Sequence, residues 1–504
     1  MLPVHCENKQ YETSEFGRRR PNLFITLPTC RDRFTYRPVQ AAPMDSYVST
    51  MVEPVSLPSR ERREAALERA GYNVFNLDAD DVFVDMLTDS GTGTMSSAQW
   101  AAAMQGDESY AGGSSFRDLE DAVEDVMGFS RIVPTHQGRG AENVLYGALL
   151  AEGDVVPNNT HFDTTRAHVV NQGADPVDCP VPEAADMDSQ APFKGNFSVE
   201  RAREVVAEHG ADAVPAVILT ITNNSAAGQP VSVENTREVA AFCDDIDATF
   251  VIDACRFAEN AHFVQQREPE FADASVAEIA GEQLSYADAV VMSGKKDGLV
   301  NMGGFVAVAD GVTVDGPAAP GAGGTDLFEL CKGRGILYEG FPTYGGISGK
   351  DIAAMAVGLR EAVTERYVRH RVAQVRALGE ALDDAGVPVY MPPGGHAVYL
   401  DAGAVYPSIP DEQFPGQALV CELYREGAVR GVELGSFAFP DTDRPELVRL
   451  AVPRRRYHDE HFEHVVDTAR AVLDRREEAV GYEVIDEPPM AELRHFSADL
   501  RPVA

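Results

Sequence analysis

Lysine is scarce in this sequence. Only six of its 43 basic residues are lysines, against 80 acidic residues, and the formal net charge at pH 7 is −37. Such a negative field repels nucleic-acid phosphates and anionic membranes, so we expect neither as a partner. An acidic, arginine-rich surface suits a cytosol of high salt, where counterions screen the repulsion between carboxylates. We therefore expect a halophilic protein.

Disulfide and membrane signals are also missing. The seven cysteines are odd in number and scattered, with neither a disulfide framework nor zinc-ligand spacing, which favours a reducing cytoplasm. Every apolar run is shorter than the ~20 residues that cross a bilayer. Charged and polar residues interrupt the N-terminus as far as Arg37, so no signal peptide is expected. At 504 residues, the chain is long enough for two domains and an extension.

The first 43 residues differ from the rest of the chain. They contain seven basic and four acidic residues and show no periodic apolar pattern. A misassigned start codon, with Met44 or Met51 as the true beginning, would explain this composition; a functional basic tail is the alternative. We expect four regions, which are an N-terminal extension (1–43), an arm that contributes to a small domain (44–94), a large domain (95–355) and a small C-terminal domain (356–504).

Beyond the arm, short apolar runs alternate with helical patterns. Two clear runs are Ala248–Ile252 and Ala287–Met292, and each is followed by polar or glycine residues. This alternation indicates an α/β domain with a mainly parallel sheet. Residues 60–70 predict a short charged helix and residues 355–378 a long one. The stretch 311–325, rich in Gly, Pro and Ala, predicts a surface loop.

Both of these runs lead into residues that could do chemistry. Asp253 directly follows the first run, and the pair Lys295–Lys296 comes just after the second. An enzyme that uses pyridoxal phosphate (PLP) needs a lysine that binds the cofactor covalently and an acid that keeps its pyridine nitrogen protonated. A lone aspartate is often a helix cap, and a lysine pair is usually solvated. Adjacent lysines behind an apolar strand nevertheless stand out in a chain that avoids lysine.

Longer motifs carry a family resemblance. The order Asp253…Lys296 resembles that of fold type I PLP enzymes, and six stretches together resemble the tryptophanase/tyrosine phenol-lyase family of β-eliminating lyases. The similarity is collinear from about residue 48 to the C-terminus. It implies an α/β, fold type I PLP-dependent transferase-like structure: a large PLP-binding domain with a mainly parallel seven-stranded sheet, and a smaller α/β C-terminal domain. The stretches are 87–92, 106–110, 134–143, 224–230, 256–260 and 339–346.

The resemblance implies roles for the residues at matching positions. Lys296 would hold PLP as a Schiff base and later handle the α-proton, Asp253 would pair with the pyridine nitrogen, and Arg449 would bind the substrate carboxylate. The other implied cofactor contacts are Arg256 and Asn224 at the phenolic oxygen, Phe162 against the ring, and Gln137, Gly138, Arg139 and Ser293 at the phosphate.

Further roles are implied outside the cofactor contacts. Thr88 and Ser90 would lie beside the substrate, and Tyr110 would act as general acid from a neighbouring subunit of a homotetramer. Family members are activated by a monovalent cation, for which we expect K⁺. Its implied ligands are the backbones of Gly91 and Asn301 and the side chain of Glu108.

Three positions favour tryptophan as the substrate. Asp163 could accept a hydrogen bond from an indole N–H, where phenol-lyases have Thr. Leu434 stands where phenol-lyases use an arginine for the phenolic oxygen. His495 matches the tryptophanase branch, and Phe496 beside it would also contact the substrate. Asn301 is closer to the phenol-lyase form, but its implied cation contact is made through the backbone.

The expected reaction is therefore β-elimination of L-tryptophan to indole, pyruvate and ammonia. Phenol release from tyrosine and elimination from cysteine or serine derivatives stay open as alternatives. An aminotransferase is a rival of another class, because it shares the lysine–aspartate pair but consumes a keto acid. A PLP-free scaffold is a further rival, against which intact Lys296, Asp253 and Arg449 argue.

Overall fold

A seven-stranded sheet organises the first part of the chain in the structure, a computed structural model that describes residues 46–48, 51–314, 324–440, 444–489 and 491–503. The strand order is β2-β8-β7-β6-β5-β3-β4, with β8 antiparallel to both of its neighbours and the other pairs parallel. The prediction of a mainly parallel sheet is confirmed. The strands are β2 (Ile132–Thr135), β3 (Val155–Asn158), β4 (Asp175–Asp178), β5 (Ala216–Thr220), β6 (Thr249–Asp253), β7 (Ala289–Ser293) and β8 (Gly304–Val308).

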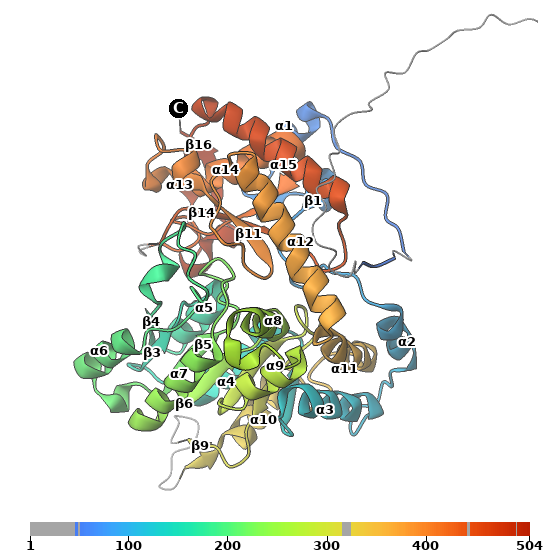
Figure 1. Cartoon of the computed structure of the whole chain (residues 1–504), viewed down its shortest axis with the longest axis vertical. Coiled ribbons are helices and arrows are strands. Elements are labelled where there is room, and N and C mark those ends of the chain that lie inside the picture. The colour runs from blue at the N-terminus through green and yellow to red at the C-terminus, as the bar shows by residue number, and fades with distance from the viewer. Residues whose placement is uncertain (1–45, 49–50, 315–323, 441–443, 490, 504) are drawn as a thin grey trace, which may run out of the picture. The chain divides into compact units, whose positions relative to one another are not determined.

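Helices cover both faces of this sheet (Figure 1). In β5, Val217 and Leu219 join the apolar core on one face, whereas Ala216 and Ile218 join the core on the other. A strand buried on both faces needs apolar side chains throughout, which explains the uninterrupted apolar runs of the sequence. The first core includes residues of α3 (Ser114–Met127), α6 (Val199–His209), α7 (Val233–Ile246), α8 (Phe257–Arg267), α9 (Val276–Leu284) and α11 (Gly349–Ala362); the second includes α4 (Gly138–Leu149), α5 (Asp163–Asn171) and α10 (Leu327–Tyr338).

The C-terminal part has a core of its own, to which the N-terminal arm contributes. Val84 and Met86 of the arm are buried in this core with residues of the antiparallel sheet β11-β14-β13. The strands are β1 (Val84–Asp85), β11 (Ala397–Asp401), β12 (Val429–Arg430), β13 (Val432–Glu433), β14 (Leu447–Ala451), β15 (Tyr482–Asp486) and β16 (Asp499–Pro502). The helices are α1 (Arg60–Arg69), α12 (Glu365–Asp384), α13 (Ala402–Val405), α14 (Pro415–Gly427) and α15 (Asp459–Asp474).

The short charged helix predicted at residues 60–70 is α1, whose first turn is capped by Ser59. The single long helix predicted at 355–378 is wrong, because two helices occupy this region. Helix α11 ends at Ala362, and Thr364 takes an extended backbone conformation before α12 begins. Two successive β-branched residues, Val363 and Thr364, disfavour continuation of the helix. Helix α12 starts in the first core and ends in the core of the C-terminal part.

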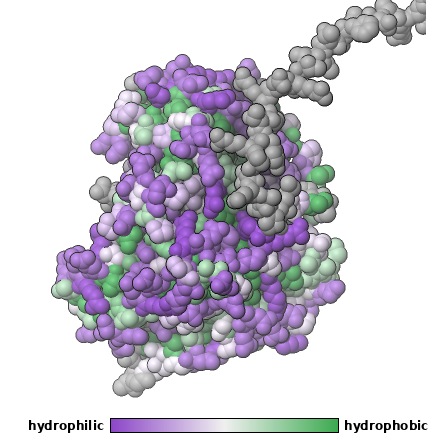
Figure 2. Space-filling view, viewed as in Figure 1, coloured by the Kyte–Doolittle hydropathy of each residue, from purple (hydrophilic) through white to green (hydrophobic). Residues whose placement is uncertain are grey.

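Several expectations concern the ends and the surface of the chain. The predicted extension 1–43 lies outside the described residues, as does most of the predicted loop at 311–325. The described ends of that loop include β9 (Thr313–Val314) and the start of β10 (Thr325–Asp326). The domain limits stay a prediction. Among the described residues, no helix has both the length and the apolar character needed to span a bilayer. The described cysteines are free and buried, and the face shown in Figure 2 is mostly hydrophilic.

Candidate active site

The predicted lysine and aspartate lie at the same edge of the sheet. Strands β5, β6 and β7 run parallel, and Asp253 at the end of β6 is in register with Thr220 of β5 and Val291 of β7. The carboxyl ends of these strands therefore meet, which brings Asp253 and the Lys295–Lys296 pair to one edge of the sheet. Lys296 is half-buried and makes no hydrogen bond through its side chain within the described chain. Asp253 accepts a hydrogen bond from the backbone N–H of Cys255 (3.0 Å).

A cradle suited to a phosphate lies at the N-terminus of α4. Gln137 precedes the helix, and its side chain leaves the first helical N–H groups uncapped. A Cβ on Gly138 would lie 2.8 Å from Ser293 Cβ, so glycine is required where the helix meets β7. The Gln137 Oε1 accepts a hydrogen bond from Lys295 Nζ (3.0 Å), and Arg139 is exposed beside it. Uncapped amides and nearby cations form an anion site.

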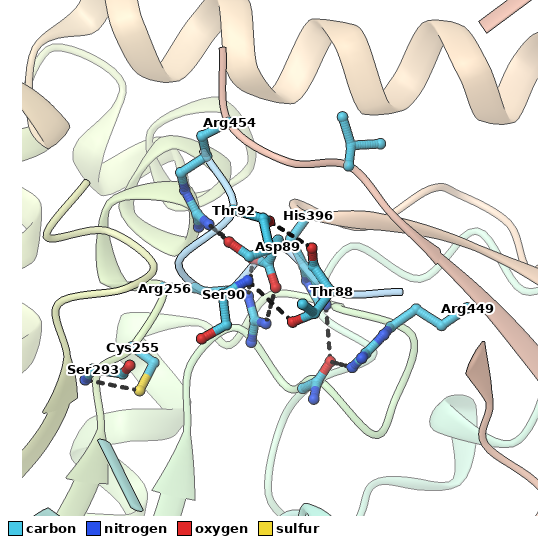
Figure 3. A network of polar contacts seen from close by, with 12 residues as sticks. Thr88, Asp89, Ser90, Thr92, Cys255, Arg256, Ser293, His396, Arg449 and Arg454 are labelled. Atoms are coloured by element: carbon cyan, nitrogen blue, oxygen red, sulfur yellow. Dashed lines mark hydrogen bonds and ion pairs between the residues drawn. The ribbon is translucent and has the colours of Figure 1, made fainter. Parts of the chain in front are cut away.

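Arg256 and Asn224 are both buried and fixed by neighbours. Arg256 donates to the Asp89 carboxylate through Nε (3.1 Å) and Nη2 (2.8 Å), as Figure 3 shows. Asn224 Oδ1 lies 2.8 Å from His396 Nε2 and accepts from the hydroxyl of Tyr399 (3.0 Å). Burial and the nearby Arg256 charge hold the pKa of His396 well below its usual range, so the imidazole is neutral and donates through Nε2.

The arginine predicted to bind the substrate carboxylate lies next to the residues expected with it. Arg449, on β14, donates to Asn224 Oδ1 (3.2 Å) and to the carbonyl of Leu87 (3.2 Å), while its buried Nε has no partner within the described chain. Its guanidinium carbon lies 5.8 Å from the centre of the Phe162 ring. Leu87 directly precedes the loop of Thr88 and Ser90, in which Ser90 N–H donates to Thr88 Oγ1 (3.1 Å).

Phe162 and Asp163 stand at the start of α5, held there by their neighbours. His161 directs its backbone N–H (2.7 Å) and its Nδ1 (2.8 Å) at the Asp178 carboxylate. From inside the fold, Thr165 donates its hydroxyl to Glu142. Burial raises the pKa of Glu142 to about 7, with the charge of Asp253 adding to this effect and the bond from Thr165 opposing it.

The three positions predicted to select the substrate lie in one buried region. His495 Nε2 is 3.3 Å from Asp163 Oδ2, and both side chains are almost fully buried. The rings of Phe496 (4.0 Å) and Phe75 (5.8 Å) lie against His495. Leu434 belongs to an apolar cluster against which Phe75 and Leu87 also pack. The result is one polar pair beside an apolar wall.

Two predicted groups lie elsewhere in the single chain. Tyr110 is 69% exposed, and its ring packs on Phe341 (5.2 Å) and Tyr344 (5.3 Å) at the surface. Glu108, an expected cation ligand, forms an ion pair with Lys350 (3.4 Å). The other two expected ligands are adjacent, because Asn301 Nδ2 donates to the carbonyl of Gly91 (2.9 Å).

Sequence reasoning missed four residues of this site: Asp89, Glu142, His396 and Tyr399. Asp89 and Glu142 lie inside motifs that carried the family resemblance, so their position pointed to the site without indicating a role. His396 and Tyr399 fall on β11 or just before it, in a part of the chain without a motif. Their hydrogen bonds to Asn224 arise only from the packing of distant segments.

The residues present fit PLP. A half-buried lysine and a carboxylate share one strand edge, and a helix N-terminus with Ser293 and Arg139 provides phosphate donors. The buried Nε of Arg449 has no partner within the described chain, so it is free to donate a hydrogen bond to a ligand carboxylate. A model of the β-eliminating lyase family matches residues 85–468, which include every one of these groups. The chain belongs to the β-eliminating lyase family.

Relatives of this β-eliminating lyase cover almost the whole chain. A "Probable tryptophanase" of Halobacterium salinarum is 68% identical over 92% of this chain and 100% of its own length. A tryptophanase of Salinibacter ruber is 48% identical over 90% of this chain and 94% of its own. A tyrosine phenol-lyase of Pasteurella multocida is 44% identical over 92% and 99%. Family membership is thus compatible with either leaving group.

Solved structures confirm the fold type I architecture. Serine palmitoyltransferase of Sphingomonas wittichii aligns with a TM-score of 0.56 at 15% identity, over 83% of this chain and 97% of its own. Histidinol-phosphate aminotransferase of Sinorhizobium meliloti, solved with pyridoxal-5'-phosphate, aligns with a TM-score of 0.56 at 14% identity, over 82% and 94%. At such low identity, these likenesses establish the fold alone.

Proposed function

We propose that this β-eliminating lyase uses PLP to cleave L-tryptophan, with water, into indole, pyruvate and ammonia. The observation that carries the proposal is the buried Asp163–His495 pair (3.3 Å) beside the apolar wall of Leu434 and Phe75. An indole presents one N–H to a polar partner and otherwise needs apolar contacts. A phenol would bring its oxygen to this wall, where Leu434 offers no hydrogen bond. The names of the two tryptophanase relatives agree with this choice.

The residues of the strand edge would prepare the substrate. When bound, PLP supplies the electron withdrawal that makes the α-carbon of an amino acid acidic. Asp253 would keep the pyridine nitrogen protonated, and Phe162 would lie against the ring. Arg449 would hold the substrate carboxylate through its unpartnered Nε. Lys296 would carry the cofactor and then move the α-proton at Nζ.

The Asp163–His495 pair would act on the leaving group. Protonation of the indole ring creates positive charge at its nitrogen, and a buried carboxylate beside that nitrogen stabilises the charge as it develops. His495 would hold Asp163 in place through Nε2, while Leu434 and Phe75 exclude water from the ring. The apolar contacts would favour indole over smaller leaving groups by area alone.

A second copy of the chain would complete the site. Tyr110 is the proposed general acid, and its 69% exposure at the surface supports its reaching into a neighbouring subunit. A homotetramer with K⁺ bound near Gly91 and Asn301 is part of the proposal. The acidic, lysine-poor composition and the buried free cysteines support a salt-rich, reducing cytoplasm as its setting.

A substrate panel tests the proposal. The enzyme, reconstituted with PLP in high salt with K⁺, is given tryptophan, tyrosine or an S-alkylcysteine, without any keto acid. We expect indole and pyruvate from tryptophan at rates well above phenol release from tyrosine. Pyruvate formation only from the cysteine derivative would move the protein to another branch of the family. Turnover that requires a keto acid would show an aminotransferase.

A double substitution tests the pocket itself. Leu434→Arg with Asp163→Thr is expected to slow tryptophan cleavage at least tenfold more than cleavage of the S-alkylcysteine, whose small leaving group needs neither residue. The matched control is Leu423→Met, a conservative change in the core of the C-terminal part. Equal losses on both substrates would contradict the assignment of the indole pocket.

A further inference from the structure

Three arginines and three carboxylates form a buried charge network beside the candidate site. Each of the six side chains is at most 5% exposed, and the formal charges cancel. Of these six, the proposed reaction gives a role to Arg256 alone. The members are Asp89, Arg256, Glu259, Asp297, Arg371 and Arg454.

Asp89 fixes the plane of the Arg256 guanidinium. Its Oδ2 accepts from Nε (3.1 Å) and its Oδ1 from Nη2 (2.8 Å), a two-point contact between a planar carboxylate and a planar guanidinium. Such a bidentate pair allows one orientation, unlike a single charge contact. Burial alone would raise the pKa of Asp89, but the charges of Arg256 and Arg454 hold it well below its usual range, so it stays ionised.

One nitrogen of Arg256 is left over by this contact. Nη1 makes no hydrogen bond within the described chain, and it is not fully buried. The atom is therefore accessible, on the side of the guanidinium away from Asp89. Arg256 follows β6 by three residues, so its backbone lies close to the strand edge of Asp253.

The rest of the network prevents Asp89 from turning. Arg454 donates through Nη1 to Asp89 Oδ2 (2.8 Å) and to its carbonyl oxygen (3.3 Å). Through Nη2, Arg454 also binds Glu259 and Asp297 (2.8 Å each), and Arg371 donates to Glu259 (2.9 Å). Figure 3 shows Asp89 between Arg256 and Arg454. With Arg256 and Arg371 (3.9 Å), arginines from three distant segments thus surround the Asp89 carboxylate.

We propose that Asp89 is a positioning residue, which aims Nη1 of Arg256 at the phenolic oxygen of the cofactor. The inference rests on the proposed PLP function and adds a residue to it. A hydrogen bond from a cation stabilises the anionic form of a phenolic oxygen and lowers the pH at which the cofactor loses its proton. If Arg256 loses its fixed orientation, this stabilisation weakens and the pH midpoint rises.

The experiment is a pH titration of the visible absorption of the bound cofactor in the holoenzyme. For Asp89→Asn, we expect the midpoint to rise by about one pH unit, a tenfold change in proton affinity. The matched control is Glu259→Gln, which removes an equal charge from the same network without contacting Arg256. Loss of a negative charge by itself lowers such a midpoint, so the control is expected to stay constant or fall.

A double-mutant cycle separates positioning from a general structural effect. Arg256→Met is combined with Asp89→Asn, which removes both charges of the pair and keeps the network neutral even if the single Asp89 variant fails to fold. In the Arg256→Met background, we expect the added Asp89→Asn to cause no rise of the midpoint, because only the small fall due to the lost charge remains. Restoration of the native midpoint by Asp89→Glu would support the same reading.

Two results would overturn the assignment of Asp89. One is a fall of the midpoint in Asp89→Asn that matches Glu259→Gln; the other is a rise of the midpoint on Asp89→Asn that persists when Arg256 is Met. Failure of the proposed function looks different, because the wild-type protein would then show no cofactor absorption that depends on Lys296.

Discussion

Lys194 is buried although the chain has few lysines, and its substitution gives a sharp test of the structure. Its Nζ donates to the carbonyls of Met391 (2.8 Å) and Ser189 (3.2 Å) and lies 3.8 Å from the centre of the Tyr390 ring. Burial lowers the pKa of Lys194 from 10.5 to about 8, although the carboxylates of Asp186 and Asp188 oppose the shift. We predict that Lys194→Met changes how stability depends on pH.

The sign follows from proton binding. The unfolded chain keeps the lysine proton up to about pH 10.5, whereas the folded chain loses it near pH 8. Between these values the unfolded state binds more protons, so the free energy of unfolding rises with pH. The full difference is about 3 kcal/mol, at about 1.4 kcal/mol for each pKa unit. Because the loop that carries Asp186 and Asp188 is exposed and water screens it, we expect about 1–2 kcal/mol.

The assay is urea unfolding at constant high salt between about pH 7.5 and 10. Over this range, the free energy of unfolding of the wild-type protein should rise by about 1–2 kcal/mol relative to that of Lys194→Met, which has no proton to lose at this position. The control is Lys350→Met, whose side chain is 62% exposed and should leave the wild-type slope unchanged. Parallel pH dependences for the wild-type protein and Lys194→Met would refute the reasoning.

Four further predictions concern stability. Burial keeps the Glu142 carboxyl protonated up to about pH 7. The free energy of unfolding of the wild-type protein should therefore fall by up to about 3 kcal/mol between pH 4.5 and 7. Urea titrations at several pH values should show no such fall for Glu142→Gln. Arg454→Met leaves three buried carboxylates short of a partner, so it should lower the free energy of unfolding by about 3–5 kcal/mol in the same assay. Substitution of the exposed Arg476 by Met should change it very little. A Cβ on Gly349 would lie 1.5 Å from the carbonyl oxygen of Asp107, so Gly349→Ala should lower the melting temperature, whereas Gly281→Ala, with open space around it, should not. Dialysis into low-salt buffer should unfold the protein, which circular dichroism would detect as lost helix signal.

The strand edge that carries Asp253 and Lys296 was predictable because its signals are local. An apolar run followed by Asp253, and another followed by Lys295–Lys296, report a buried strand and the groups at its end without reference to any distant residue. Parallel strands then place those ends together, since their hydrogen bonding aligns the carboxyl termini. The single long helix predicted at 355–378 failed for the opposite reason. Its apolar pattern continues through Val363 and Thr364, although the backbone turns there.

The pairings that complete the site could not be predicted from local patterns. Asp163 and His495 are far apart in the sequence, and only the packing of η8 (Ala491–Phe496) against α5 brings them to 3.3 Å. Before that packing is known, each has an ordinary explanation as a helix cap or a surface histidine. Their burial together is what supports the proposed role of the carboxylate at the leaving group.

The sequence by itself determined the fold class and the strand edge that carries Asp253 and Lys296, because periodic burial and a collinear set of motifs are properties of short segments. Only the tertiary structure decided how Arg256 is oriented and that Asp89 is the residue that orients it. Three arginines and three carboxylates drawn from distant segments can be buried together only where their charges cancel and their hydrogen bonds are satisfied. That condition depends on the positions of all six side chains at once, which no single stretch of the chain contains.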